Sequence, residues 1–193
     1  MALHPWHPTT GAVADVSEPL EHVLTGGHHN SLGRTIEVVE LVLAEPTRFE
    51  ELFETYRSQD EVVRLRTSNA MRRIQAERHD LLVPYIDRFI EEIGALDQAS
   101  AQWTIALLFH KLRNDMTAGQ KGAALAIMKR NLAEHNDWIV LNNTMETLTL
   151  WAKESPGLRA FVIPHLKRLT EDGRKSVMSR AKKYLAQLDA DTA

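Results

Sequence analysis

The stretch DEVVRLRTSNAMRRI, residues 60–74, decides the fold that the sequence predicts. Apolar and small side chains recur in it at the spacing that places them on one face of a helix: Val63, Thr67, Ala70, Met71 and Ile74. Asp60 stands just before this face, in the position of an N-cap residue. We therefore expect an amphipathic helix here, with one apolar side that another element must cover.

Two later stretches repeat this pattern. DQASAQWTIALLFHK begins at Asp97 and DWIVLNNTMETLTLW begins at Asp137, which gives spacings of 37 and then 40 residues. We expect each of the three aspartates to cap its helix. Each stretch also carries a threonine seven residues after its aspartate: Thr67, Thr104 and Thr144. A weaker fourth copy runs through residues 176–185.

The segments between these helices match one another as well. LLVPYIDRFI (81–90) and AFVIPHLKRLT (160–170) share a proline, at Pro84 and Pro164, while GAALAIMKRNLAEH (122–135) keeps the apolar spacing without one. No segment alternates with period two over the length of a strand, so no sheet is expected. The predicted fold class is all-α. Its repeating unit is a helix, a short turn, a second helix and a longer connection.

Helix pairs that recur at this length are typical of α-solenoids, and the pattern resembles the HEAT repeats of the armadillo-like proteins. The first helix of that family often reads Asp-x-x-Val-Arg-x-x-Ala-x-x-Ala-Leu, which residues 60–71 follow with Thr67 for the first alanine. The resemblance covers roughly residues 31–188. It implies one domain over residues 30–193, a short right-handed superhelix of about four to five antiparallel helix pairs.

Residues 1–29 differ from the rest, because prolines and glycines interrupt them at positions 5, 8, 11, 19, 26 and 27. We expect an N-terminal extended arm here, in which only PLEHVL (19–24) can form a turn or two of helix. This end is also acidic: residues 1–59 hold three arginines and nine acids.

Composition excludes several classes of protein. The 193 residues contain no cysteine, which rules out disulfides and thiolate zinc sites and fits a reducing cytoplasm. No apolar run is long enough to span a membrane, and the N-terminus lacks the basic start of a secretory signal. We therefore expect a cytoplasmic protein with no membrane partner. The net charge of −3 disfavours binding to nucleic acid.

The sequence offers no catalytic site, metal site or cofactor site. It lacks a Gly-x-Ser-x-Gly elbow, a phosphate-binding Gly-x-x-x-x-Gly-Lys loop and a His-Glu-x-x-His element, so its nine histidines predict no metal centre. Trp103, Trp138 and Trp151 are interpreted as packing residues, with a stacking platform for bases as the alternative. Small residues, namely Ala70, Ala106 and Ala181, should let neighbouring helices approach closely.

The remaining candidate is a groove formed by the second helices, which usually line the concave side of a solenoid. Aligning these helices by their apolar stripes places five cations along one groove: Arg88, Lys129, Arg130, Lys167 and Arg168. Guanidinium groups in a row would suit carboxylates or phosphates. The alternative is that each arginine pairs with a neighbouring acid or faces water. A further basic cluster is interpreted as part of a solvent-facing surface: Arg64, Arg66, Arg72 and Arg73.

Two functions follow from these features. The first hypothesis is a non-enzymatic scaffold that binds a peptide or an acidic protein partner in the groove; the exposed ends of the array would also permit a homodimer. The second is a nucleic-acid-binding or DNA-repair protein, because some HEAT-like proteins are alkylpurine DNA glycosylases. Such an enzyme needs a carboxylate and aromatic side chains, for which Asp137 and the tryptophans are available, although no local motif matches. Some short HEAT proteins are bilin lyases, but no residue here selects a tetrapyrrole.

Overall fold

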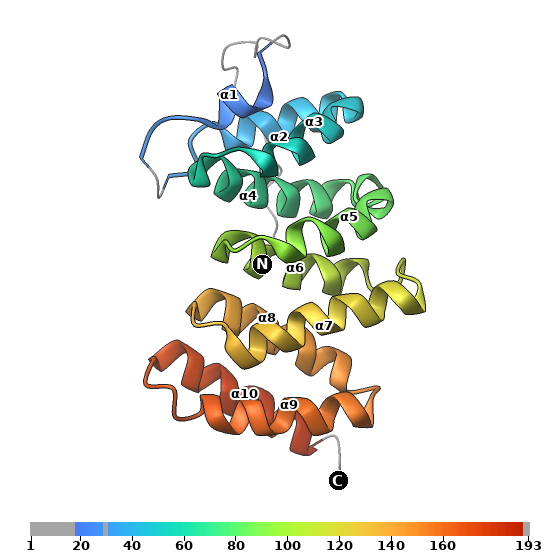
Figure 1. Ribbon diagram of the computed structural model, residues 1–193, viewed down its shortest axis with the longest axis vertical. Helices are drawn as coiled ribbons and strands as arrows, with labels where there is room; N and C mark the ends of the chain where they lie inside the picture. Colours follow the sequence, from blue (N-terminus) through green and yellow to red (C-terminus); the bar gives the residue numbers. More distant parts are fainter. Residues whose placement is uncertain (1–17, 29–30, 191–193) are drawn as a thin grey trace, which may run out of the picture.

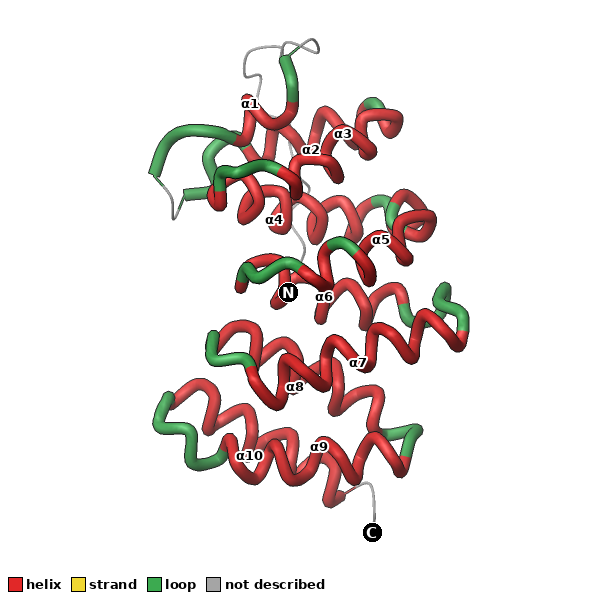
Figure 2. The backbone as a smooth tube through the Cα atoms, in the orientation of Figure 1, coloured by secondary structure: helices red, strands yellow, loops and turns green. Residues whose placement is uncertain are grey.

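The computed structural model of this chain describes residues 18–28 and 31–190. Within these ranges every regular element is a helix, and no strand is present (Figure 2). The all-α class that the sequence predicts is therefore confirmed. In the same part of the chain, no helix combines the length and the apolar character needed to cross a bilayer.

The described residues form ten α-helices, some of which are extended by short 3₁₀ turns. The α-helices are α1 (Leu20–Leu24), α2 (Thr35–Ala44), α3 (Phe49–Glu54), α4 (Glu61–Glu77), α5 (Ile86–Glu91), α6 (Ala99–Leu112), α7 (Ala118–Glu134), α8 (Trp138–Ala152), α9 (Pro156–Leu169) and α10 (Lys175–Ala190). The 3₁₀ turns are η1 (Pro46–Arg48), η2 (Thr55–Arg57), η3 (His79–Leu81), η4 (Val83–Tyr85) and η5 (Ile93–Ala95).

The helices are stacked along the long axis of the molecule in the order of the chain (Figure 1). The even-numbered helices form one row, in which α2 packs on α4, α4 on α6, α6 on α8 and α8 on α10. The odd-numbered helices alternate with them, and α5 packs on α7. Each element thus makes its main contacts with elements that are close to it in sequence.

The middle of the even row is buried most completely. In α6 every residue from 100 to 106 is buried, and α8 is buried around most of its circumference. Small residues allow these two helices to touch: the Thr147 hydroxyl of α8 donates to the Ala106 carbonyl of α6 at 2.9 Å. Ala106 is fully buried at this contact, as its small size predicts.

Two of the three predicted aspartate caps are present. The Asp60 carboxylate accepts the Val62 amide at 2.8 Å at the start of α4, and Asp137 accepts the Ile139 amide at 2.8 Å at the start of α8. The prediction for Asp97 is wrong, because Gln98 is the N-cap residue of α6. The side-chain amide of Gln98 donates a hydrogen bond to the Glu61 carbonyl of α4, at 3.1 Å.

The two predicted proline-containing helices differ in length. α9 runs without a break through Pro164. Around Pro84 the chain forms only the turns η3 and η4 before the six-residue α5, which begins at Ile86. Proline has no amide hydrogen to donate, and the residue before it is biased away from the helical region. Pro84 accordingly lies in the turn before α5, whereas α9 accommodates Pro164 within the helix.

The N-terminal segment confirms the short helix predicted for PLEHVL, which is α1; residues 1–17 and 29 of the predicted arm lie outside the described residues. The prediction that Arg66 faces solvent is wrong, because its side chain is completely buried. Its guanidinium donates to the backbone carbonyl of Leu24 at the end of α1, at 2.6 Å, and to carbonyls of the loop that follows: Gly26 at 2.7 Å, Ser31 at 3.2 Å and His28 at 3.3 Å. Hydrogen bonds to a charged donor are strong, so Arg66 fixes this loop on α4.

Gly33 closes the same loop at a φ of 51°, and a Cβ atom there would lie 2.6 Å from Cζ of Arg66. Gly33→Ala should therefore lower the free energy of unfolding by about 2–3 kcal/mol, through backbone strain and overpacking. The matched control is Gly122→Ala in α7, where a Cβ meets nothing within 4 Å. There the gain in helix propensity should stabilise the protein by about 0.5–1 kcal/mol. Urea unfolding of both variants measures the two changes, and effects of the same sign would contradict this account.

Candidate functional site

The five cations predicted to line a groove lie on α5, α7 and α9, and the first of them is already paired. Arg88 of α5 forms ion pairs with Glu50 at 2.7 Å, Glu54 at 2.5 Å and Glu92 at 2.5 Å. Its guanidinium also lies 4.2 Å from the centre of the Phe53 ring. Hydrogen bonds to Glu92 and the other two carboxylates raise the pKa of Arg88. Arg88 thus joins α3 to α5 and has little capacity left for a ligand.

The other two arginines, Arg130 and Arg168, donate to backbone carbonyls that lie 36 residues earlier in the chain. Nη2 of Arg130 donates to the Gly94 carbonyl at 2.9 Å, and Nη2 of Arg168 donates to the Leu132 carbonyl at 2.8 Å. Both side chains nevertheless remain exposed. Each arginine of the series therefore reaches back by 34–38 residues, which is about one helix pair.

The two lysines of the predicted groove have different surroundings. Nζ of Lys129 in α7 lies 5.0 Å from the centre of the Phe161 ring in α9, and this contact joins the two helices. Lys167 is exposed. The five cations do lie on successive helices of the odd row, as the comparison of the second helices predicted. The three arginines among them, however, bond to elements of the same protein.

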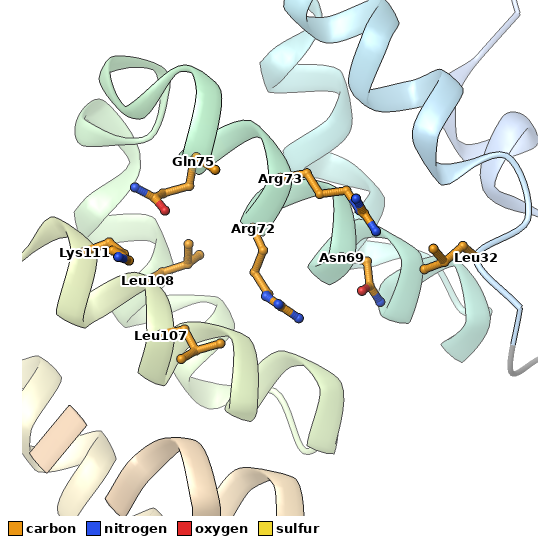
Figure 3. A pocket seen from close by; sticks show the side chains of 9 residues that line it. Leu32, Asn69, Arg72, Arg73, Gln75, Leu107, Leu108 and Lys111 are labelled. Atoms are coloured by element: carbon orange, nitrogen blue, oxygen red, sulfur yellow. The ribbon is translucent and has the colours of Figure 1, made fainter. Parts of the chain in front are cut away.

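A different surface has the features of a binding site. A pocket of about 520 Å³, called the cationic pocket below, lies between α4 and α6 and is bounded at one end by the segment before α2 (Figure 3). In Figure 3, Arg72 and Arg73 extend from α4, Leu107 and Lys111 come from α6, and Leu32 lies at the far end. Its complete lining is Leu32, Asn69, Arg72, Arg73, Gln75, Ala76, Leu107, Leu108 and Lys111.

The cationic pocket has three positive charges and no carboxylate in its lining. The Arg72 guanidinium lies 5.3 Å from the centre of the Trp103 ring, so one of its faces is covered by an aromatic side chain. Burial lowers the pKa of Arg72, and the neighbouring charge of Arg73 lowers it further. The guanidinium stays charged, but its charge is less well stabilised here than in water. An anion bound among these cations would remove that penalty.

A second hollow, of about 480 Å³, lies beside the cationic pocket between α2 and α4, and is called the α2–α4 groove below. Ile36, Val39 and Leu43 of α2 form its apolar wall. Arg73 and Ala76 line both hollows, so the two adjoin on α4. The remaining lining residues of the groove are the acids Glu40 and Glu77.

The prediction that Arg72 and Arg73 face solvent is confirmed, but the sequence did not indicate that they line a pocket. One local sign was available: the positions three and four residues away from Arg72 on either side hold no acid, so no partner exists on its own helix. Lys111 follows one repeat later on the next first helix. A cluster made of these three cations was therefore detectable only after α4 and α6 were known to be adjacent.

Other groups that bear on chemistry are engaged in the fold. Trp103 and Trp151 are buried, which confirms their interpretation as packing residues; for Trp138 that interpretation is wrong, because this side chain is 49% exposed. Among the described residues, no group of three or more histidines and acids is placed to hold a metal ion. Comparison of the sequence with known proteins gives no match, either among family models or among curated proteins. Functional conclusions therefore rest on the surfaces described above.

Arg88 gives the odd row a pH dependence with a definite sign. The Tyr85 hydroxyl and Arg88 lower the pKa of Glu50 below its ordinary value of 4.5, and Arg88 together with Arg57 lowers that of Glu92. Groups with lowered pKa values stabilise the fold above their unfolded pKa, and this stabilisation is lost as the pH falls through the folded value. Arg88→Met should lower the free energy of unfolding at neutral pH by about 2 kcal/mol, and the difference should shrink below about pH 4.

Urea unfolding of Arg88→Met at neutral and acidic pH measures this effect. Arg78→Met is the matched control, because Arg78 is exposed and pairs only with its neighbour Asp80, at 2.7 Å. That control should change stability by less than about 0.5 kcal/mol at either pH. A loss for Arg88→Met that is equal at both pH values would show that packing on Phe53, and not the carboxylates, accounts for its effect.

Proposed function

We propose that this chain is a short right-handed solenoid of about four to five HEAT-like helix pairs, which acts in the cytoplasm as a non-enzymatic module for binding other proteins. The order of the stacked helices supports this proposal (Figure 1). Hydrogen bonds between residues separated by about the length of one helix pair also support it. Thr147 bonds to Ala106 across 41 residues, and Arg130 bonds to Gly94 across 36. Arrays of this kind present extended surfaces of fixed shape, and such surfaces suit a protein partner.

The partner that we propose is an acidic segment of another protein, and the cationic pocket is the observation that carries this proposal. Arg72, Arg73 and Lys111 line it without a carboxylate among them. Hydrogen bonds between cations and carboxylates are about twice as strong as neutral ones, and a forked guanidinium binds both carboxylate oxygens. The apolar side chains of Leu107 and Leu108 beside these cations exclude water and would strengthen the attraction.

This proposal moves the binding surface from the odd row to the even row. The carboxylates around Arg88 supply the neutralising charge that a ligand would otherwise bring. Arg130, Lys167 and Arg168 are exposed, and remain a secondary surface for an acidic partner. Arg72, by contrast, has an aromatic ring on one side and a like charge on the other.

Nucleic acid is the competing partner, because three unpaired cations also suit phosphate groups. A glycosylase-like reaction has less support. The Asp137 carboxylate caps α8 by accepting the Ile139 and Val140 amides, and both Trp103 and Trp151 are buried under arginines. In addition, a phosphate backbone that crossed from the cationic pocket to α2 would meet Glu40 and Glu77. These carboxylates favour a ligand whose negative charge is confined to one end.

The proposal predicts that Arg73→Glu combined with Lys111→Glu weakens binding of a fluorescein-labelled oligo-glutamate peptide by about tenfold or more. Both side chains are exposed, so the fold should be unaffected. The matched control is Lys175→Glu combined with Lys182→Glu, which makes the same change in net charge on exposed positions of α10. Fluorescence anisotropy with the full-length protein measures both affinities. Equal weakening by the two variants would show that only net charge matters.

A labelled DNA duplex, titrated at two salt concentrations, separates the two classes of partner. Binding to DNA that is tighter than binding to the peptide, with a salt dependence equivalent to several phosphate contacts, would favour the nucleic-acid function. Weak DNA binding that the Arg73 and Lys111 substitutions leave unchanged would support the protein-binding function.

A further inference from the structure

Two of the exposed large apolar side chains in the described part of the chain lie at the hollows beside α4. Among the described residues only three large hydrophobic side chains are exposed: Leu32 at 39%, Ile36 at 42% and Trp138 at 49%. Leu32 lines the cationic pocket and Ile36 lines the α2–α4 groove. Apolar side chains that gather around a hollow and are rimmed by charges mark an interaction surface.

The two hollows adjoin at α4, where one of the two residues that they share is small. Asn69, Arg73 and Ala76 follow one another at helical spacing along the same side of α4. Ala76 is exposed and lines both the cationic pocket and the α2–α4 groove. Its short side chain lets a ligand pass over α4 from α6 to α2 without obstruction.

Charge differs between the two ends of this site. The end at α6 holds Arg72 and Lys111 with no carboxylate, whereas the end at α2 holds an apolar wall together with Glu40 and Glu77. Building on the proposed function, we propose that the site recognises an amphipathic segment of a protein partner, with acidic side chains at one end and large aliphatic side chains at the other. The acidic end lies on α6 and the aliphatic end lies on Ile36 and Leu43 of α2.

Arg66 prepares this site before any ligand arrives. Its guanidinium holds the carbonyl of Ser31 at 3.2 Å, and Ser31 is the residue next to Leu32. Gly33, on the other side of Leu32, donates its amide to the Ser31 hydroxyl at 3.0 Å. A preorganised wall costs less conformational entropy on binding than one that must be ordered by the ligand. Arg66 is thus a positioning residue for the apolar part of the site.

The charge pattern distinguishes this ligand from two others. A nucleic acid carries its negative charge along its whole length and would bring phosphates to Glu40 and Glu77. A second copy of this chain would make the even row an interface between subunits. The proposal therefore commits to a segment of a different protein, and self-association of this chain through the same surface would overturn it.

The test uses the full-length protein and two fluorescein-labelled helical peptides. The first carries glutamates at its N-terminal end and leucines on one face of its C-terminal end; the second has serine in place of each leucine. Anisotropy should show that the leucine peptide binds about tenfold or more tightly than the serine peptide, because buried leucines add affinity. The double variant Ile36→Ser, Leu43→Ser should abolish this preference while it still binds the serine peptide.

Ala76→Phe is a second variant that reports on continuity. A large ring at this exposed position should prevent a peptide from lying across α4. It should weaken binding of the leucine peptide at least as much as the double variant does. If the unmodified protein binds both peptides equally, the inference fails, although the proposed function stands. If Arg73→Glu with Lys111→Glu leaves binding of the serine peptide unchanged, the proposed function itself fails. Sedimentation that shows a dimer which Ile36→Ser dissociates would assign the surface to a second copy and overturn the inference.

Discussion

The contact between α6 and α8 is the constraint on which the rest of the molecule depends. Both helices are buried on most of their circumference, so each requires cover from both neighbours. The Thr147 hydroxyl bonded to the Ala106 carbonyl shows how closely their backbones approach. One neighbour cannot cover a helix that is apolar on most of its circumference. α4 therefore covers the outer side of α6, and α10 covers the outer side of α8. Stability in a stack of helices is shared between neighbours, as the physics of repeat arrays illustrates.

The contacts that join neighbouring helices differ between the even row and the odd row. Direct packing of small and apolar side chains joins the even helices, and their outer surface is left free to vary. In the odd row, where α5 has only six residues, arginines supply much of the connection: Arg88 binds three carboxylates, and Arg130 and Arg168 bind carbonyls about 36 residues earlier in the chain. This difference explains why the arginines that look like a ligand groove in the sequence are mostly structural. The even row can hold unpaired cations because it does not need them for cohesion.

Local patterns predicted most of the fold, and contacts between pairs account for what they missed. The helical spacing of residues 60–74 and the caps at Asp60 and Asp137 depend on neighbours in sequence, so they could be recognised directly. Asp97 does not cap α6 because Gln98 is bonded to Glu61, which lies 37 residues earlier. The burial of Arg66 depends on carbonyls 35–42 residues away. The binding site failed to appear in the sequence for the same reason, since its walls come from α2, α4 and α6.

Arg66 and Arg72 stand six residues apart on α4, and their contrast bears on function. Arg66 is completely buried, yet backbone carbonyls satisfy its guanidinium from several directions, which offsets the cost of removing the charge from water. Arg72 is exposed beside Trp103, where desolvation and the like charge of Arg73 lower its pKa. A neutral side chain at position 72 would avoid that cost. Sequences that break a local rule without a structural gain do so mainly at functional sites. The grouping of Arg72 with Arg73 and Lys111, in a pocket lining without a carboxylate, is thus the strongest physical reason to place an anionic partner on α4 and α6.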